Sequence, residues 1–205
     1  MSVISGPMES ASATRKQLTH ERIVDTAARV LRETGFYGVG VADIMKRAGL
    51  THGGFYAHFP SRDALLVEAL ERAGQDSRGR MQRSIDAGEK KAVGRFRALV
   101  ESYLSDRHLA SPESGCPVAA LASEMPRQSD AVRAAGARRV QSLTEAVAAT
   151  LPDGEPDETA GIVASQLVGA LQLARALGDN AKGRCHLAAS RQFLLEQFEP
   201  VPNGR

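Results

Sequence analysis

The sequence predicts an all-α protein with an N-terminal three-helix head and a larger helical body. Two observations support this fold class. Apolar residues recur at intervals of three and four through most of the 205-residue chain. Ser, Thr, Gly and Pro residues stand where these periodic stretches begin or end, as expected at helix boundaries. We find no convincing β-strand pattern, and the length suffices for a substantial core.

Residues 1–16 are predicted to be a disordered tail, because the first 13 are rich in Ser, Gly and Ala. The first helix should begin at Thr19 as its N-cap and end at Gly35. Its apolar face is formed by Ile23, Val24, Ala27, Val30 and Leu31.

A short helix is predicted at 41–48, with Val41, Ile44, Met45 and Ala48 facing inward and Gly49 ending it. Another follows at 52–59, capped by Thr51 and stopped by Pro60. Ser61 should cap a longer helix that starts near Arg62. Its apolar stripe is Leu65, Leu66, Ala69, Leu70 and Ala73.

The remainder also has helical periodicity. We expect helices around 96–104, 117–125, 127–150 and 157–177, and a last one carrying Leu187, Leu194, Leu195 and Phe198. On the helix 157–177 the predicted inward side is Ile162, Gln166, Leu167, Ala170, Leu171 and Ala174. The predicted domains are a head at 17–77 and a ligand-binding and dimerisation body at 78–205.

Charge is unevenly distributed along the chain. Residues 1–62 hold 8 Lys and Arg against 5 Asp and Glu, whereas residues 63–205 hold 18 against 19. A basic head on a neutral body suits a polyanion partner. No apolar run looks long enough to span a bilayer and no secretory signal is evident, so we expect a cytoplasmic protein. The two cysteines indicate neither a disulfide framework nor a metal site, and no cofactor is expected.

The helix 41–48, the turn 49–51 and the helix 52–59 together predict a helix-turn-helix, spanning about 40–59. In this motif the second helix enters the major groove of DNA and its N-terminal residues meet base edges. Those residues are Thr51, His52, Gly53 and Gly54. The two glycines remove bulk, which would let the helix sit close to the duplex. Phe55 and Phe59 lie four apart and should face inward.

Several neighbouring side chains are candidates for phosphate contacts. Tyr56 and His58 are expected to point outward, and the Tyr56 hydroxyl is a suitable phosphate donor. Arg62 stands at a helix start, where its charge and free N–H groups can both meet a phosphate. Arg15 and Lys16 can add contacts from the beginning of the first helix.

Residues 17–77, which include "HERIVDTAARVLRETGFYGVGVADIMKRAGLTHGGFYAHFPSRDALL", resemble the TetR family of bacterial repressors. The resemblance implies an all-helical homodimer with a DNA-binding head and a variable ligand-binding body. It also implies operator binding by Thr51, His52, Gly53, Gly54, Tyr56, His58 and Arg62. Two positions depart from the family pattern: Gly40 replaces a frequent capping Thr that touches phosphate, and Arg62 replaces a common Lys.

The body is expected to convert a chemical signal into a change in the spacing of two DNA heads. The last two long helices are the predicted dimer interface, since the resembled family pairs them in a four-helix bundle. Small residues would allow close approach there, or would equally pack within one chain. They are Gly161, Ala164, Ser165, Gly169 and Ala170.

The segment "SGCPVAALASEM" suggests a sensor. Cys116 precedes a probable helix start, where backbone N–H groups favour the reactive thiolate. The segment also resembles a TetR branch in which some members respond to electrophiles through such a cysteine. The alternative is an inert buried cysteine, and Cys185 is interpreted as structural or incidental. A small-molecule pocket is the other inducer route, although its candidate lining residues suit a plain core equally well. They are Phe96, Leu99, Tyr103, Val118, Leu121 and Met125.

Two other function classes are alternatives to a one-component repressor. No nucleophile elbow, phosphate loop or zinc-protease motif is present, so we expect no enzyme; a thiol-dependent activity at Cys116 is the only opening. A helical ligand-binding or interaction protein without a DNA role is the other alternative. The sequence does not reveal the inducer, the operator, the target genes or the sign of regulation.

Overall fold

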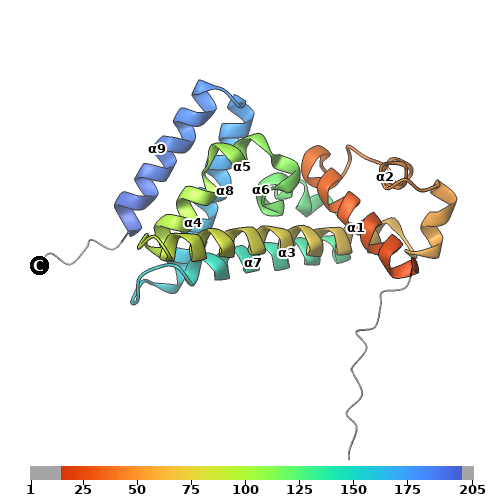
Figure 1. Ribbon diagram of the computed structural model, residues 1–205, viewed down its shortest axis with the longest axis horizontal. Helices are drawn as coiled ribbons and strands as arrows, with labels where there is room; N and C mark the ends of the chain where they lie inside the picture. The colour runs from red at the N-terminus through yellow and green to blue at the C-terminus, as the bar shows by residue number, and fades with distance from the viewer. Residues whose placement is uncertain (1–14, 200–205) are drawn as a thin grey trace, which may run out of the picture.

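The computed structural model describes residues 15–199, and every regular element within that range is a helix. The predicted all-α class is therefore confirmed. Figure 1 shows a small head at one end, a larger body at the other and one long helix running through both. Most of the predicted tail lies outside the described residues. Its last two residues, Arg15 and Lys16, already belong to the first helix.

The head contains α1 (Arg15–Thr34), α2 (Val41–Arg47), the short 3-10 helix η1 (His52–Ala57) and the first half of α3 (Arg62–Glu89). The predicted cap at Thr19 is wrong, because α1 begins four residues earlier and the Thr19 hydroxyl donates to the Arg15 carbonyl at 2.9 Å. Gly35 ends α1 as predicted. Its φ of +78° is the left-handed conformation that glycine adopts most readily.

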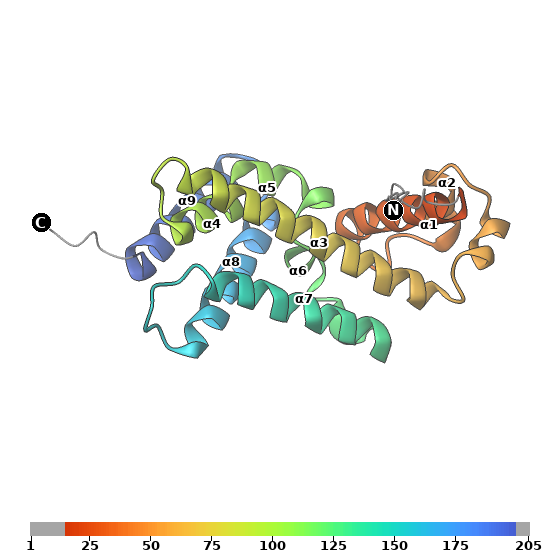
Figure 2. The ribbon, with the colours of Figure 1, turned by 60° about the horizontal axis from the view of Figure 1, so that its bottom comes forward.

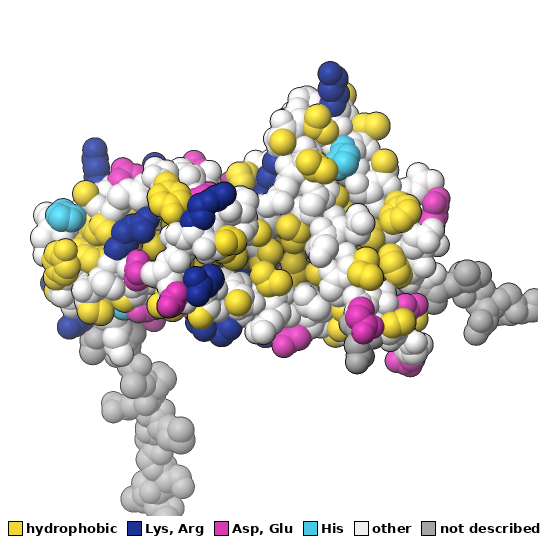
Figure 3. All heavy atoms as spheres, turned by 180° about the vertical axis from the view of Figure 1, so that it is seen from behind, with side chains coloured by type: hydrophobic (Ala, Val, Ile, Leu, Met, Phe, Trp, Pro, Cys, Tyr) yellow, Lys and Arg dark blue, Asp and Glu magenta, His cyan; other side chains and the backbone are white. Residues whose placement is uncertain are grey.

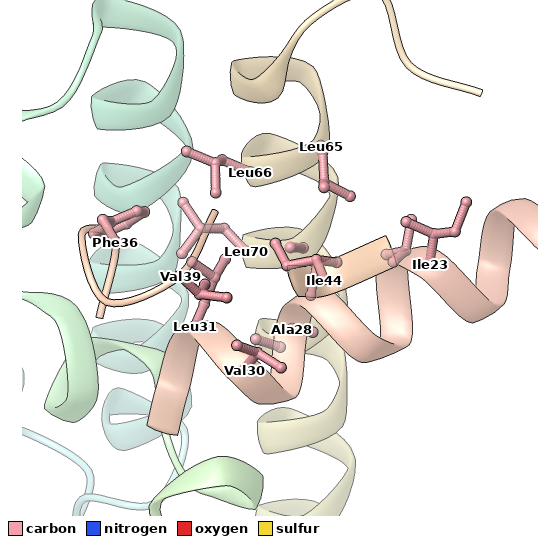
Figure 4. Close-up of a cluster of buried hydrophobic side chains, with 14 of the residues drawn as sticks. Ile23, Ala28, Val30, Leu31, Phe36, Val39, Ile44, Leu65, Leu66 and Leu70 are labelled. Atoms are coloured by element: carbon pink, nitrogen blue, oxygen red, sulfur yellow. The ribbon is translucent and has the colours of Figure 1, made fainter. Parts of the chain in front are cut away.

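The predicted apolar faces meet in the head core. In Figure 4, Leu31 of α1, Ile44 of α2 and Leu70 of α3 converge with Phe36 and Val39 of the turn between α1 and α2. Phe55 and Phe59 are buried as expected, with ring centroids 5.6 Å apart in a stacked arrangement. Both rings lie in the head core, and η1 packs against α2.

The body is built on the second half of α3. It comprises α4 (Arg95–Tyr103), α5 (Asp106–Ala110), η2 (Pro112–Ser114), α6 (Pro117–Leu121), η3 (Met125–Arg127), α7 (Asp130–Ala148), α8 (Asp157–Leu177) and α9 (Ala181–Phe198). Figures 1 and 2 both show α7 lying along α3, and α8 pairs with α9 at the far end from the head. A second apolar core fills the space between these helices.

Helix α3 is continuous across the predicted domain boundary at residue 77. The Ser61 hydroxyl accepts from the Ala64 backbone N–H at 3.1 Å, which confirms the predicted cap. No proline interrupts the following 28 residues, so nothing in the chain forces a break between head and body. The two units therefore share one helix instead of being joined by a linker.

Helix α8 agrees with its prediction in part, since Leu167, Ala170, Leu171 and Ala174 are buried as predicted. Its buried side is centred on Val163, Leu167 and Leu171, whereas Ile162 and Gln166, predicted inward, are exposed. The sequence expectation about membranes also needs correction. Among the described residues one helix, Glu158–Leu177, is long and apolar enough to span a bilayer, with mean hydropathy 1.3. This is weak evidence for a membrane, since its apolar side packs on α7 and α9 and core helices of soluble proteins have the same composition.

The head and body meet through polar contacts as well as apolar ones. The Glu124 carboxylate of the body accepts from the Phe36 backbone N–H of the head at 2.9 Å. The same carboxylate lies so close to Gly35 that a β-carbon there would approach it within 2.4 Å. Leu121 and Met125, also of the body, complete the head core. The segment that follows Cys116 is thus packed directly against the turn after α1.

Candidate DNA-binding surface and effector cavity

The predicted recognition helix is shorter and tighter than expected. Residues His52–Ala57 form a 3-10 helix and not an α-helix extending to Phe59. Thr51 precedes it in an extended conformation, with φ −81° and ψ 149°, and its side chain makes no capping hydrogen bond. Thr51, His52 and Gly53 are exposed and Gly54 is half-buried. The residues predicted to meet base edges therefore lie together on one open surface.

The internal packing of the head does not require a glycine at position 53. A β-carbon at Gly53 would have no heavy atom within 4 Å, and one at Gly54 would make only ordinary contacts at 3.8 Å. Neither residue has a positive φ. Glycine in a helix also costs up to about 1 kcal/mol relative to alanine. The reason for these glycines must therefore lie outside the folded head, which agrees with close approach to a ligand.

Tyr56 is the most exposed aromatic side chain of this surface, at 72 %. Its ring edge contacts Phe55, with centroids 5.2 Å apart, so the buried phenylalanine orients it. Arg15 and Lys16 are exposed on the first turn of α1. Gly40 is the N-cap of α2 as expected, with open space around it and no hydroxyl to offer a phosphate.

Two predicted DNA contacts are directed elsewhere in the described conformation. His58 does not point outward: it is half-buried, its Nδ1 is buried without a partner, and its ring lies near His20 and Phe59. Burial, with smaller effects from His20 and Lys16, lowers the pKa of His58. Arg62 donates to the Phe36 carbonyl through Nη2 and is partly buried. Both side chains support the head instead of extending from it.

A cavity of about 370 Å³ lies in the body between α3, α4, α5 and the segment 114–116. Tyr103 alone of the six predicted pocket residues lines it. Phe96 and Leu99 belong to the body core, Leu121 and Met125 to the head core. Val118 borders a smaller neighbouring space between α3 and α7. The prediction chose mainly apolar residues, whereas most of the residues that line the cavity carry polar groups.

The lining residues that the prediction missed include a polar stripe on α3. Ser77, Arg80, Ser84 and Ala87 recur at intervals of three and four, so they share one side of the helix. Arg83, on a neighbouring side of α3, lines the same part of the cavity. Arg107 and His108 of α5 face it as well. Helical spacing could have grouped the α3 residues, although only the fold shows that they face a void.

Cys116 also lines the cavity, with a residue exposure of 3 %. Its backbone N–H donates to His108 Nε2 at 2.9 Å, which makes Nδ1 the protonated nitrogen, and Nδ1 donates to the Tyr103 carbonyl at 2.7 Å. Burial lowers the pKa of His108 to about 4, so the ring is neutral at pH 7. The backbone at Cys116 is thus tied to α4 and α5 through one imidazole. Cys185 lies exposed on α9.

Comparison with known proteins decides the family. Residues 23–69 match the model of bacterial regulatory proteins of the tetR family, and residues 92–182 match the C-terminal domain of LmrA/YxaF-like transcriptional regulators. An uncharacterized HTH-type transcriptional regulator of Mycobacterium tuberculosis is 30 % identical over 78 % of this chain and 85 % of its own length. The chain belongs to the TetR family. It is a DNA-binding transcriptional regulator, and members of this family are not enzymes.

Other TetR proteins are similar over nearly the whole chain. The transcriptional repressor NemR of Escherichia coli is 25 % identical over 91 % of this chain and 89 % of its own. The crystal structure of its reduced form superposes with a TM-score of 0.74 at 22 % identity, covering 91 % of this chain and 99 % of that one. A TetR regulator from Agrobacterium tumefaciens gives 0.72 at 22 % identity, covering 90 % and 99 %. These structures share the head-and-body fold.

Replacing Gly53 with Ala is expected to separate folding from DNA binding. The head has room for the methyl group, so the urea midpoint should stay equal or rise slightly. Operator affinity, measured by fluorescence anisotropy, should fall because the added group meets the duplex. Gly94→Ala, at another open position in the body and outside the proposed dimer helices, is the matched control and should leave affinity intact. Unchanged DNA binding by Gly53→Ala would show that the glycine is not needed for close approach.

Stability should decline in acid through His108. Its folded-state pKa of about 4 lies below the ordinary 6.5, so its contribution is present above pH 6.5 and is lost as the pH falls toward 4. At pH 5 the loss should reach about 2 kcal/mol in urea unfolding. Because His58 titrates in the same direction, the informative comparison is with His108→Gln, whose stability should depend less on pH. Equal pH profiles for the two proteins would contradict this assignment.

Proposed function

We propose that this regulator is a cytoplasmic homodimeric repressor. It binds a palindromic operator through Thr51, His52, Gly53, Gly54 and Tyr56 of each subunit, and an effector in the body cavity releases it. The observation that carries the DNA-contact assignment is the exposed 3-10 helix with two glycines that internal packing does not explain. Arg15 and Lys16, exposed at the N-terminus of α1, supply further positive charge to the head. Figure 3 also shows several Lys and Arg side chains on the half of the molecule that carries the head.

The proposed dimer forms through α8 and α9. Ile162, Leu173 and Leu177 of α8 and Phe193 of α9 are large apolar side chains left exposed in the single chain. Figure 3 shows hydrophobic side chains on this part of the body. Among the predicted small residues, Ser165 is exposed and Gly161 and Gly169 have open space around them. Ala164 and Ala170 instead pack within the chain. A second copy would cover the exposed apolar groups and set the two heads about one DNA turn apart, ~34 Å.

The route from effector to operator follows the segment 116–125. It begins at Cys116 in the cavity wall and ends where Glu124 accepts from the Phe36 N–H and Met125 enters the head core. A change at the cavity that moves α6 must therefore disturb the turn after α1. A ligand favouring that altered arrangement would shift the dimer away from the spacing needed for the operator.

Cys116 remains the candidate redox or electrophile sensor. Its position on the cavity wall gives a reagent a path to an otherwise buried thiol. Modification there would add bulk beside Tyr103 and His108 and so displace the start of α6. The alternative is that Cys116 only fills space between the helices.

Operator binding tests the proposed function directly. Fluorescence anisotropy with DNA from upstream of the coding sequence should show saturable binding that weakens as salt rises. Tyr56→Phe removes only the exposed hydroxyl and should weaken binding about tenfold or more, because a hydrogen bond to a charged phosphate is lost in each subunit. Tyr37→Phe, at another exposed tyrosine of the head, is the matched control. Equal affinity for all three proteins would remove Tyr56 from the interface.

Release by a reactive compound tests Cys116. In a Cys185→Ser background, benzoquinone or hydrogen peroxide should dissociate the complex, and the additional Cys116→Ser change should abolish that response. Affinity without the reagent should stay unchanged, because Cys116 lies in the body. Should both proteins release DNA alike, the thiol has no sensing role.

A further inference from the structure

The cavity wall has an unusual composition for a small-molecule site. Such sites are lined mainly by apolar and aromatic groups with a few polar ones. Here the wall contains three arginines and five serines. Its apolar groups come from Met81, Ala87, Cys116 and the ring of Tyr103. None of the described residues that line it is Asp or Glu. A neutral apolar effector would leave these cations in contact with it and without compensation.

The three guanidinium groups are close to one another and are not neutralised by the wall. Arg80 is half-buried and donates to the Gly115 carbonyl at 3.3 Å. Burial lowers the pKa of Arg80; Asp76 raises it, and Arg83 and Arg107 lower it again by repulsion. Asp76 is itself paired with Arg32 at 3.4 Å. Within residues 15–199, neither Arg83 nor Arg107 has an ion pair.

One buried donor in the wall lacks a strong acceptor. The Tyr103 hydroxyl is buried, with a residue exposure of 4 %, and meets no oxygen or nitrogen acceptor among the described groups. The Cys116 side chain lies beside it, but sulfur is a weak hydrogen-bond partner. A bound oxygen atom would accept from it, next to the arginine side chains that attract negative charge.

We propose that this cavity binds a small organic anion, a carboxylate or a phosphate ester, held by Arg80, Arg83 and Arg107 with Tyr103 as a further donor. Planar guanidinium groups pair with both oxyanions in two-point geometry. The volume of about 370 Å³ suits a compound of roughly one ring. The inference rests on the proposed effector role of the cavity and specifies the chemistry of the effector.

Anion binding has a direct consequence for the head. The Gly115 carbonyl accepts from Arg80 and also, at 3.5 Å, from Arg32 of α1. An anion that draws Arg80 away from this carbonyl alters the contact between the cavity wall and the head. The same residue, Gly115, precedes Cys116, so ligand and thiol act on one short segment.

Thermal unfolding without DNA tests the proposal. Sodium benzoate and phenyl phosphate, each at 10 mM and constant ionic strength, should raise the melting temperature by about 2–4 °C. Benzamide, a neutral compound of similar shape to benzoate, should not. No stabilisation by either anion, or equal stabilisation by benzamide, would overturn the proposal.

Matched variants locate the effect. Arg83→Gln with Arg107→Gln removes two charges from the cavity and should abolish the shift, whereas Arg95→Gln with Arg133→Gln removes two exposed charges elsewhere and should retain it. If the cavity variant keeps the full shift, the anions bind at another surface and the proposal fails. The unfolding experiment contains no DNA. A failed anion site is therefore distinguished from a failure of operator recognition.

A second readout reports occupancy of the cavity itself. In a Cys185→Ser background, the rate at which methyl methanethiosulfonate modifies Cys116 should fall several-fold with benzoate or phenyl phosphate and stay constant with benzamide. Anions that stabilise the protein without slowing this reaction would place the bound anion outside the cavity and contradict the proposal.

Discussion

Arg32 is a buried cation at the junction of head and body, and its hydrogen bonds constrain how the two units meet. Only 4 % of the residue is exposed. Burial lowers its pKa, and the neighbouring Asp76 opposes that effect. A guanidinium in this position must be surrounded by acceptors, because an unpaired buried charge is strongly unfavourable. The Ala73 carbonyl of α3, the Gly115 carbonyl and Asp76 provide them. The direction of α1 relative to the body is therefore coupled to the backbone at Gly115.

Gly115 is at the centre of this junction for steric reasons as well. A β-carbon there would approach His108 Nε2 within 2.6 Å and Arg175 Nη2 within 3.0 Å. The residue after it, Cys116, donates its backbone N–H to the same imidazole. One short segment consequently contacts the head through Arg32, the cavity through Arg80 and α5 through His108. In the proposed regulation, this segment would connect an event in the body to the DNA-binding head.

Apolar periodicity was sufficient to predict the long helices and most of the core, because residues such as Ile23, Leu31 and Leu70 are most stable inside. It did not predict α5 or η2, and the helix expected at 117–125 ends at Leu121. It failed where a tertiary contact decides the outcome. Thr19 has a side chain that could cap a helix, yet α1 begins four residues earlier. Arg62 could bind a phosphate, yet its guanidinium donates a hydrogen bond to the Phe36 carbonyl. Ile162 is apolar, yet it faces away from the core of its own chain.

The cavity was the least predictable feature, for a physical reason. A search for apolar lining residues finds those that pack best, and Phe96 and Leu99 do pack, so they leave no space. A void remains where the lining side chains, such as Arg80 and Ser84, are polar and would be costly to bury in tight apolar packing. The proposed DNA-contacting surface needed less tertiary information, since its residues are adjacent in sequence and local helix geometry alone brings Thr51 through Tyr56 together.

The unbroken α3 has a consequence for anyone who wishes to exchange parts between regulators of this kind. Its 28 residues make a rod of about 42 Å whose ends belong to different units. A chimera must be spliced within a helical turn, with the registers of both fragments in phase. An insertion of a single residue would rotate the grafted head by about 100° relative to the body. Transplanting this head therefore requires its half of the rod to be carried along with it.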